Sequence, residues 1–185
     1  YGDVRERIDN LRRRLADVSG DEIAHLVAQR VIDRRYAEPK LIARGAMGFV
    51  FKCRDTKSNN RDTAVKVMSP LVSEGKKEAA ARFIREAELV ARISHANVIK
   101  IYDVYPGALP YFSMEFVRSQ SLADVLKIRG KLEQDAAVEI AAQICDGLQA
   151  AHESSVVHRD VKPGNVLLDE DMDVKLVDFG IAKFE

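Results

Sequence analysis

The order of strand-like and helical runs constrains the fold of this 185-residue chain more than any other feature of its sequence. Three β-rich runs, KLIARG, FVFKCRD and DTAVKVM, lie between residues 40 and 68, and the turn-rich stretch KSNNRD precedes the third. A helix rich in Ala, Glu and Lys is expected at about 76–93, and the runs NVIKIYDVY and YFSMEFV then extend to Val117. Five strands and one helix, followed by a helical region, predict an α+β fold in two parts with a boundary near Val117.

The second part is expected to be mainly helical. A short helix is predicted at 121–130 and a longer one at about 133–153, where small and aliphatic residues recur on one face. Two strand-like runs, NVLLD and DVKLVD, follow after a loop.

Residues 1–35 form a separate polar region with a helical pattern. Apolar residues recur there at alternating steps of four and three: Val4, Ile8, Leu11, Leu15 and Val18. The stretch Ser19–Glu22 then has the S-x-x-E form of a capping box, which predicts the start of a second helix. Two interpretations stay open, a helical pair that packs on its own domain, which we favour, and a short dimerising coiled coil through which the chain self-associates.

Charge and cysteine content exclude several classes of function. Lys and Arg together number 29, as do Asp and Glu, so no net charge points to nucleic acid or to a membrane surface. The cysteines, Cys53 and Cys145, lie far apart and outside any CxxC motif, which suits a reducing compartment and gives no thiolate metal site. No apolar run approaches the roughly 20 residues that a membrane-spanning helix needs. Since the first residue is Tyr1, we expect that the natural N-terminus is missing, and membrane anchoring of a longer protein stays open.

Two motifs in the first part suggest phosphate binding. In ARGAMGFV, Gly45 and Gly48 lie between strand-like runs, where backbone amides can approach a phosphate, although a plain glycine-bearing hairpin gives the same pattern. In TAVKV, Lys66 lies on an apolar strand, where it either faces water or forms a fixed cation beside an anionic partner. Glu86 could supply the partner carboxylate, with Glu88 and Glu78 as competitors.

The stretches HRDVKPGN and DFG carry the strongest chemical signal. Asp160 lies in a predicted loop, where its carboxylate can accept a hydroxyl proton, and Lys162 can neutralise phosphate charge. Asn165 and Asp178 offer the oxygen ligands that magnesium prefers, alongside phosphate oxygens.

Taken in order, the glycine loop, the AVK lysine, the helix glutamate, HRDxKxxN and DFG give the chain a family resemblance. It resembles a eukaryotic-like (Hanks-type) serine/threonine protein kinase of the bacterial branch. The resemblance covers residues 36–185 and implies a bilobal fold, with a five-stranded antiparallel N-lobe at 36–117 that carries one helix, and a partial helical C-lobe at 118–185. It also implies ATP and Mg²⁺ as cofactors, and phosphoryl transfer to Ser and Thr hydroxyls of a protein partner in cytoplasmic signalling.

The resemblance assigns roles to individual residues. Asp160 would be the catalytic base, Lys162 a cation on the phosphates, and Asn165 and Asp178 the magnesium ligands. Lys66 would contact the α- and β-phosphates and pair with Glu86, which the spacing to HAN selects over its neighbours. The remaining nucleotide contacts would come from the glycine loop, from the residues around adenine and from the segment that follows: Ile42, Ala43, Arg44, Gly45, Ala46, Met47, Gly48, Phe49, Val50, Ala64, Met114, Glu115, Val117 and Leu167. Val90, Ile101, His158 and Phe179 would stack in an apolar column.

Departures from the family pattern leave an alternative function open. Ala43 replaces the first glycine of the loop, and no activation segment follows the DFG motif before the chain ends at Glu185. We therefore expect a fragment of the kinase domain, truncated after the DFG motif and inactive by itself. The alternative is a nucleotide-binding interaction module without catalysis. A small-molecule kinase with the same core is a further alternative, and the chain resembles that class less, since HRDxKxxN with DFG is typical of protein kinases.

Overall fold

The computed structural model describes residues 35–45, 47–69, 77–107 and 109–179. Helices and strands follow one another in this order: β1 (Tyr36–Gly45), β2 (Gly48–Asp55), β3 (Arg61–Met68), α4 (Lys77–Val90), β4 (Ile101–Tyr105), β5 (Tyr111–Glu115), β6 (Ser119–Ser121), α5 (Leu122–Arg129), α6 (Gln134–Glu153), the 3₁₀ turn η2 (Pro163–Asn165), β7 (Val166–Asp169) and β8 (Val174–Leu176). The helices expected within residues 1–35 lie outside the described residues.

The described residues divide into two compact units. The first unit contains the residues up to Arg85 together with Tyr102–Phe116, and the second contains Glu86–Ile101 together with the residues from Val117 onward. Each unit has its own sheet, five-stranded in the first and three-stranded in the second.

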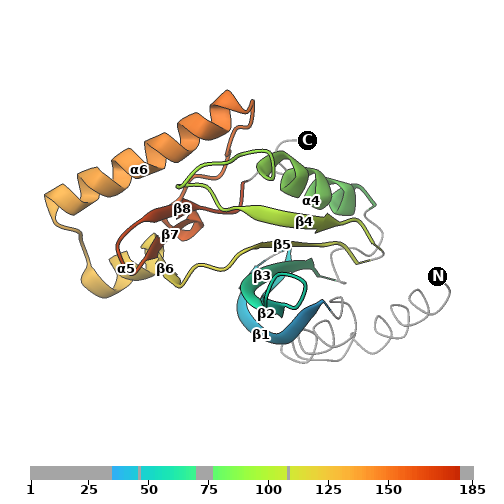
Figure 1. Ribbon diagram of the computed structural model, residues 1–185. Helices are drawn as coiled ribbons and strands as arrows, with labels where there is room; N and C mark the ends of the chain where they lie inside the picture. The colour runs from blue at the N-terminus through green and yellow to red at the C-terminus, as the bar shows by residue number, and fades with distance from the viewer. Residues whose placement is uncertain (1–34, 46, 70–76, 108, 180–185) are drawn as a thin grey trace, which may run out of the picture. The chain divides into compact units, whose positions relative to one another are not determined.

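The first unit is built on a sheet with the strand order β1-β2-β3-β5-β4 (Figure 1). The pairs β1–β2, β2–β3 and β3–β5 are antiparallel, and β-branched and aromatic residues alternate along these strands as a half-buried sheet requires. One face is almost fully buried and contains these side chains: Phe51, Cys53, Thr63, Val65, Val67 and Ser113. The Phe83 ring from α4 lies 5.2 Å from the Phe112 ring of β5, between ring centroids.

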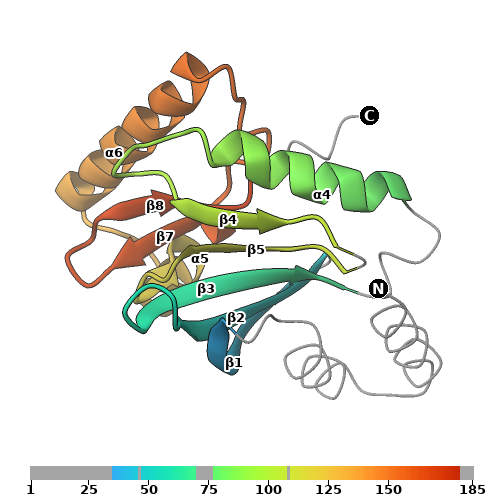
Figure 2. The same cartoon turned by 45° about the vertical axis from the view of Figure 1, so that its right-hand side comes forward.

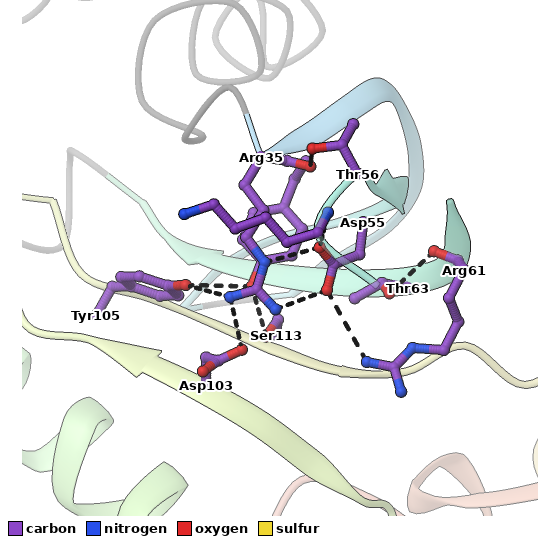
Figure 3. Close-up of polar contacts among 10 residues, drawn as sticks. Arg35, Asp55, Thr56, Arg61, Thr63, Asp103, Tyr105 and Ser113 are labelled. Carbon is purple, nitrogen blue, oxygen red and sulfur yellow. Dashed lines mark hydrogen bonds and ion pairs between the residues drawn. The ribbon is translucent and has the colours of Figure 1, made fainter. Parts of the chain in front are cut away.

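A polar network joins the start of β1 to three other strands (Figure 3). Arg35 donates from Nε and Nη2 to the two carboxylate oxygens of Asp55 at the end of β2, both at 2.7 Å. Its Nη1 also lies 3.0 Å from Asp103 Oδ2 and donates to the Tyr105 hydroxyl on β4. The hydroxyl of Tyr36 donates to Ser113 Oγ on β5 at 2.9 Å. The bonds fix the place where the polypeptide enters the sheet.

Gly48, at the start of β2, packs directly against the backbone of β3. A Cβ atom added there would meet the carbonyl oxygen of Val67 at 2.0 Å and the carbonyl carbon at 2.9 Å. A Cβ atom at Gly45, in contrast, would meet nothing within 4 Å. The packing of the sheet therefore requires a glycine at position 48, whether or not a phosphate binds to the loop.

Replacing Gly48 with Ala is expected to lower the free energy of unfolding by about 1–3 kcal/mol, the cost of forcing atoms into a packed core. Replacing Gly45 with Ala is the matched control, and we expect a change within about 0.5 kcal/mol because the position is open. Urea unfolding of the two variants measures both values. Equal stability of the two variants would contradict this account of Gly48.

The second unit contains the sheet β6-β7-β8, in which neighbouring strands are antiparallel. Helix α6 packs beside β8, as Figure 2 shows. On its other edge β8 is joined by residues 97–99: Leu176 N donates to the Asn97 carbonyl at 2.8 Å, and Ile99 N donates to the Leu176 carbonyl at 3.0 Å. Ser121 caps α5 by accepting a hydrogen bond from Asp124 N.

The observed elements confirm the predicted strands and helices, with shifted ends. Helix α4 begins at Lys77 and ends at Val90 rather than at residue 93. Strand β4 begins at Ile101 rather than at Asn97, because residues 97–99 pair with Leu176 instead. Strand β6, with the sequence SQS, was not predicted. In the described part of the chain no helix is both long and apolar enough to span a membrane.

Candidate functional site

The loop of residues 158–165, here called the HRD loop, gathers polar side chains in the second unit. Lys162 Nζ lies 2.8 Å from Asp160 Oδ2, and Asn165 Nδ2 donates to the same oxygen at 3.1 Å. The Asp160 side chain is 19% exposed, so its carboxylate is sheltered but still reachable. The ion pair with Lys162, which is 52% exposed, contributes at most about 1 kcal/mol to stability. Stability therefore does not explain why the two charges are placed together.

Asn165 joins the HRD loop to residues 177 and 178, which follow β8. Its Nδ2 donates to the Asp160 carbonyl at 2.9 Å and to the Asp178 carbonyl at 3.4 Å. Its backbone carbonyl accepts a hydrogen bond from Val177 N at 3.0 Å. Asn165 is 6% exposed, so the bonds also satisfy a buried amide. Since Nδ2 is used for these bonds, Oδ1 is the side-chain atom that can coordinate a cation.

The buried side chain of His158 connects the HRD loop to the residues that follow β8. Its ring is 1% exposed and stacks on Phe179, with 4.3 Å between ring centroids. Burial lowers the pKa of His158, although its hydrogen bond to the Val177 carbonyl opposes the shift. A neutral ring fits the contacts, because Nδ1 accepts from Asp160 N at 3.3 Å and Nε2 can then donate to the Val177 carbonyl at 3.1 Å. His158 therefore ties the backbone of Asp160 to the residue that precedes Asp178.

The backbone on either side of this group is strained. Arg159 has a φ of 60° and Asp178 has a φ of 55°, in the left-handed region that residues with a Cβ rarely adopt. Such conformations persist only where surrounding contacts hold them, and they concentrate at functional sites. Arg159 immediately precedes Asp160, and Asp178 carries the side chain expected to bind metal.

In the first unit, the strand register places four of the expected nucleotide contacts on one face of the sheet. Val50 pairs with Lys66 across β2 and β3, and Ala64 pairs with Met114 across β3 and β5. Directly paired residues, and residues two apart on one strand, lie on the same side of a sheet. Ala64 is 3% exposed, and Val50, Lys66 and Met114 are half-buried. Lys52 pairs with Ala64 and so lies on this face as well. Apolar side chains beside Lys66 are suited to a flat ring that carries anionic groups.

The glycine loop forms the hairpin between β1 and β2, with pairing that continues to Gly45 opposite Gly48. Ile42 is 49% exposed, and Arg44 is also exposed, so this end of the hairpin can contact a ligand. Phe49 is 7% exposed and its ring lies 6.4 Å from that of Phe51, so only its backbone is placed for such a contact. Ala46 lies outside the described residues.

The expected site residues are thus distributed over both units. In the first unit lie Ile42, Ala43, Arg44, Gly45, Met47, Gly48, Phe49, Val50, Ala64, Lys66, Met114 and Glu115. In the second unit lie Glu86, Val117, Asp160, Lys162, Asn165, Leu167 and Asp178. The hydrogen bonds above bring Asp160, Lys162 and Asn165 together and link them to the backbone of Asp178. The pairing of Lys66 with Glu86 stays a prediction.

Within the described ranges, no group of three or more His, Cys, Asp or Glu side chains could hold a metal ion by itself. The donor set of Asn165 and Asp178, an amide oxygen and an exposed carboxylate, fits magnesium, which takes few protein ligands beside phosphate oxygens. Sequence reasoning missed one pair of side chains near the site, Asn97 and Gln143, which are bonded at 3.0 Å across 46 residues. Their local sequences carry no signal of this contact.

Comparison with known proteins agrees with this arrangement. The model of the protein kinase domain family matches residues 36–185. A probable serine/threonine-protein kinase of Clostridium acetobutylicum is 40% identical over 154 residues, which cover 83% of this chain and 23% of that protein. The PknA serine/threonine-protein kinase of Corynebacterium glutamicum is 37% identical over 161 residues, which cover 84% of this chain and 34% of that protein. The chain thus spans about a quarter to a third of the length of these relatives.

Solved structures show the same fold. The crystal structure of the Mycobacterium tuberculosis PknI kinase domain matches with a TM-score of 0.69 at 28% identity, over 81% of this chain and 60% of that one. The apo form of PpkA-294 matches with a TM-score of 0.70 at 21% identity, over 78% and 58% of the two chains. The expected protein-kinase-like fold, with a five-stranded sheet and a partial helical lobe, is therefore confirmed. The chain belongs to the family of bacterial Hanks-type serine/threonine protein kinases.

Proposed function

We propose that the protein transfers the γ-phosphoryl group of ATP to Ser and Thr hydroxyls of other proteins. One observation carries the proposal most directly, the HRD loop in which Asp160 accepts contacts from both Lys162 and Asn165. Phosphoryl transfer has a loose transition state, so an enzyme contributes mainly by positioning groups and by neutralising charge. A sheltered carboxylate beside an ammonium group supplies both.

In this proposal the residues of the second unit serve the acceptor hydroxyl and the metal. Asp160 orients the hydroxyl and accepts its proton, and Lys162 neutralises charge on the transferred phosphoryl group. Asn165 through Oδ1 and Asp178 through its carboxylate would hold Mg²⁺. When bound, Mg²⁺ would neutralise the phosphate oxygens. Glu86 belongs to the same unit and would hold Lys66 in place.

The residues of the first unit would bind the nucleotide. Lys66 would contact the α- and β-phosphates, and the glycine loop from Ile42 to Val50 would cover the phosphates with its backbone amides. Val50 and Ala64, together with Leu167 from the second unit, would contact the adenine ring. Met114, Glu115 and Val117 would line the edge of the adenine site. The shared face of Val50, Ala64, Lys66 and Met114 supports these roles.

Further proposals concern the organisation and location of the protein. We propose an N-lobe at 36–117, a partial C-lobe at 118–185 and a helical extension at 1–35, whose role in self-association stays a prediction. Both cysteines are unbonded, and the proposed reaction consumes ATP, which together support a kinase domain in the cytoplasm. Whether a longer protein is anchored to a membrane stays open.

The test is transfer of labelled phosphate from ATP to a generic Ser/Thr protein acceptor by the full-length protein. We expect labelled phosphoserine or phosphothreonine when Mg²⁺ is present and none when it is removed with a chelator. Nucleotide binding without any transfer would instead favour the non-catalytic binding module.

A further inference from the structure

Two amide side chains join three segments of the second unit. Asn97 Nδ2 donates to Gln143 Oε1 on α6 at 3.0 Å and to the Val174 carbonyl on β8 at 3.0 Å. Gln143 Oε1 also accepts a hydrogen bond from Val174 N at 2.8 Å. Its Nε2 donates to the Met172 carbonyl, just before β8, at 3.4 Å. Both backbone polar groups of the fully buried Val174 are thus bonded to these two side chains.

These bonds hold the edge of β8 that does not face β7. Strand β8 has only three residues, and its register is set on one side by pairs such as Leu168 with Val174. On the other side, the backbone of Asn97 accepts from Leu176 N at 2.8 Å. So short a strand has few backbone hydrogen bonds to its neighbours. Hydrogen bonds from side chains therefore contribute substantially to fixing its register.

A glycine on helix α6 permits a close approach to Asn97 and β8. Gly147 lies one turn after Gln143 and on the same face of the helix. A Cβ atom at Gly147 would meet the Asn97 carbonyl oxygen at 2.9 Å and the Leu176 Cδ1 atom at 2.9 Å. The helix therefore lies closer to residue 97 and β8 than a side chain at position 147 would allow, and Gln143 comes within hydrogen-bonding distance.

Strand β8 leads directly to the expected metal ligand. Val177 follows it, with its N–H bonded to the Asn165 carbonyl and its carbonyl bonded to His158 Nε2. Asp178 comes next, in its strained backbone conformation. A shift of β8 along its neighbours would therefore move the Asp178 carboxylate relative to Asn165.

We propose that Asn97 and Gln143 are positioning residues, which fix the register of β8 and thereby place Asp178 beside Asn165 for the magnesium-bound nucleotide. The proposal rests on the proposed function only in taking Asp178 as a metal ligand. Outer partners of metal ligands commonly change metal affinity about 10–100-fold when they are removed.

The test compares variants of Gln143 in the full chain. Gln143→Met keeps the length of the side chain but removes its hydrogen bonds, and we expect the Mg²⁺ concentration for half-maximal ATP binding to rise about tenfold. Gln143→Glu keeps an oxygen for Val174 N and Asn97 Nδ2, and we expect a change of less than about threefold. Amide exchange at Val174 N–H is expected to accelerate in the Met variant and to stay close to native in the Glu variant.

Two controls separate positioning from simple loss of stability. Gln149 lies on the exposed side of the same helix, where its side chain donates to Glu153 Oε1, and Gln149→Met is expected to change neither readout. Ile140→Val removes a buried methyl group from α6 and keeps both amide side chains, so it is expected to lower the melting temperature but to leave the Mg²⁺ dependence native.

Each outcome decides the proposal. Native exchange and native Mg²⁺ dependence in Gln143→Met would overturn it, and so would faster exchange with unchanged Mg²⁺ dependence, which would leave the pair a purely structural role. An equal shift in Ile140→Val would overturn it as well. If the native chain binds ATP without regard to Mg²⁺, the proposed function fails instead, and exchange at Val174 alone then decides whether the pair holds β8.

Discussion

Replacing Asp160 with Asn is expected to lower the rate of phosphoryl transfer by roughly 10²–10⁴-fold, the range typical of a lost general base. An amide has nearly the shape of the carboxylate, and its oxygen can still accept from Lys162 Nζ and Asn165 Nδ2. It cannot accept the proton of the substrate hydroxyl. The HRD loop would therefore stay folded while the chemical step is lost. The measurement is the rate of labelled phosphate transfer by the full-length protein.

The controls for Asp160→Asn test folding and specificity. Asp171→Asn makes the same chemical change in an exposed turn between β7 and β8. We expect its activity to stay within twofold of native and its free energy of unfolding to change by no more than about 0.5 kcal/mol, as for other surface substitutions. The melting temperature and the affinity for magnesium-bound ATP are expected to stay near native in both variants. Native activity in Asp160→Asn would refute the role of Asp160 as catalytic base.

The largest expected effect on stability comes from Asp55. Replacing it with Ala is expected to lower the free energy of unfolding by about 3–5 kcal/mol, the cost of removing one partner of a buried ion pair. The Asp55 side chain is 1% exposed and receives two bonds from Arg35 (Figure 3). It receives a third from Lys57 N. Without it, the Arg35 guanidinium, only 16% exposed, would lose its main counter-charge. Urea unfolding measures the difference.

Asp62→Ala is the matched control for this effect. Asp62 is 41% exposed and pairs with Lys52 at 2.7 Å, so its removal is expected to cost no more than about 1 kcal/mol. Equal losses from Asp55→Ala and Asp62→Ala would contradict the claim that the Arg35 network stabilises the sheet.

The acid dependence of stability gives an independent check on Asp55. The Arg35 guanidinium lowers the pKa of Asp55 from the ordinary value of 3.8 to about 2, although burial opposes the shift. A lowered folded-state pKa means that the folded chain binds the proton less readily than the unfolded chain. The stabilisation that ionised Asp55 contributes to the folded chain is therefore present above about pH 4 and is lost as the pH falls toward 2. The stability difference between the native chain and Asp55→Asn is expected to shrink over that window.

The sequence was informative wherever a function or an element depends on neighbours along the chain. Asp160, Lys162 and Asn165 lie within six residues of one another, so their spacing alone brought them into one loop. The strands that hold Val50, Ala64 and Lys66 were predicted from their β-like runs, and the observed register places the three residues on one face. Local pattern was sufficient in both cases.

Features that depend on distant contacts could not be predicted in this way. Strand β6 has the sequence SQS, with no β-branched or aromatic residue, and it forms because Ser119 and Ser121 pair with residues of β7. No local pattern marks Asp55, because its partner Arg35 lies 20 residues away. Gly48 was assigned to phosphate binding, and only the structure shows that Val67 also requires it.

The most direct test of the central claim is calorimetric titration of the chain with ATP, with and without Mg²⁺. We expect binding that depends on Mg²⁺ and that Asp178→Ala weakens by more than about tenfold, the loss of one metal ligand in a site with few. A folded chain that binds no adenine nucleotide, or that binds it equally well in the presence of a chelator, would contradict the assignment of this site.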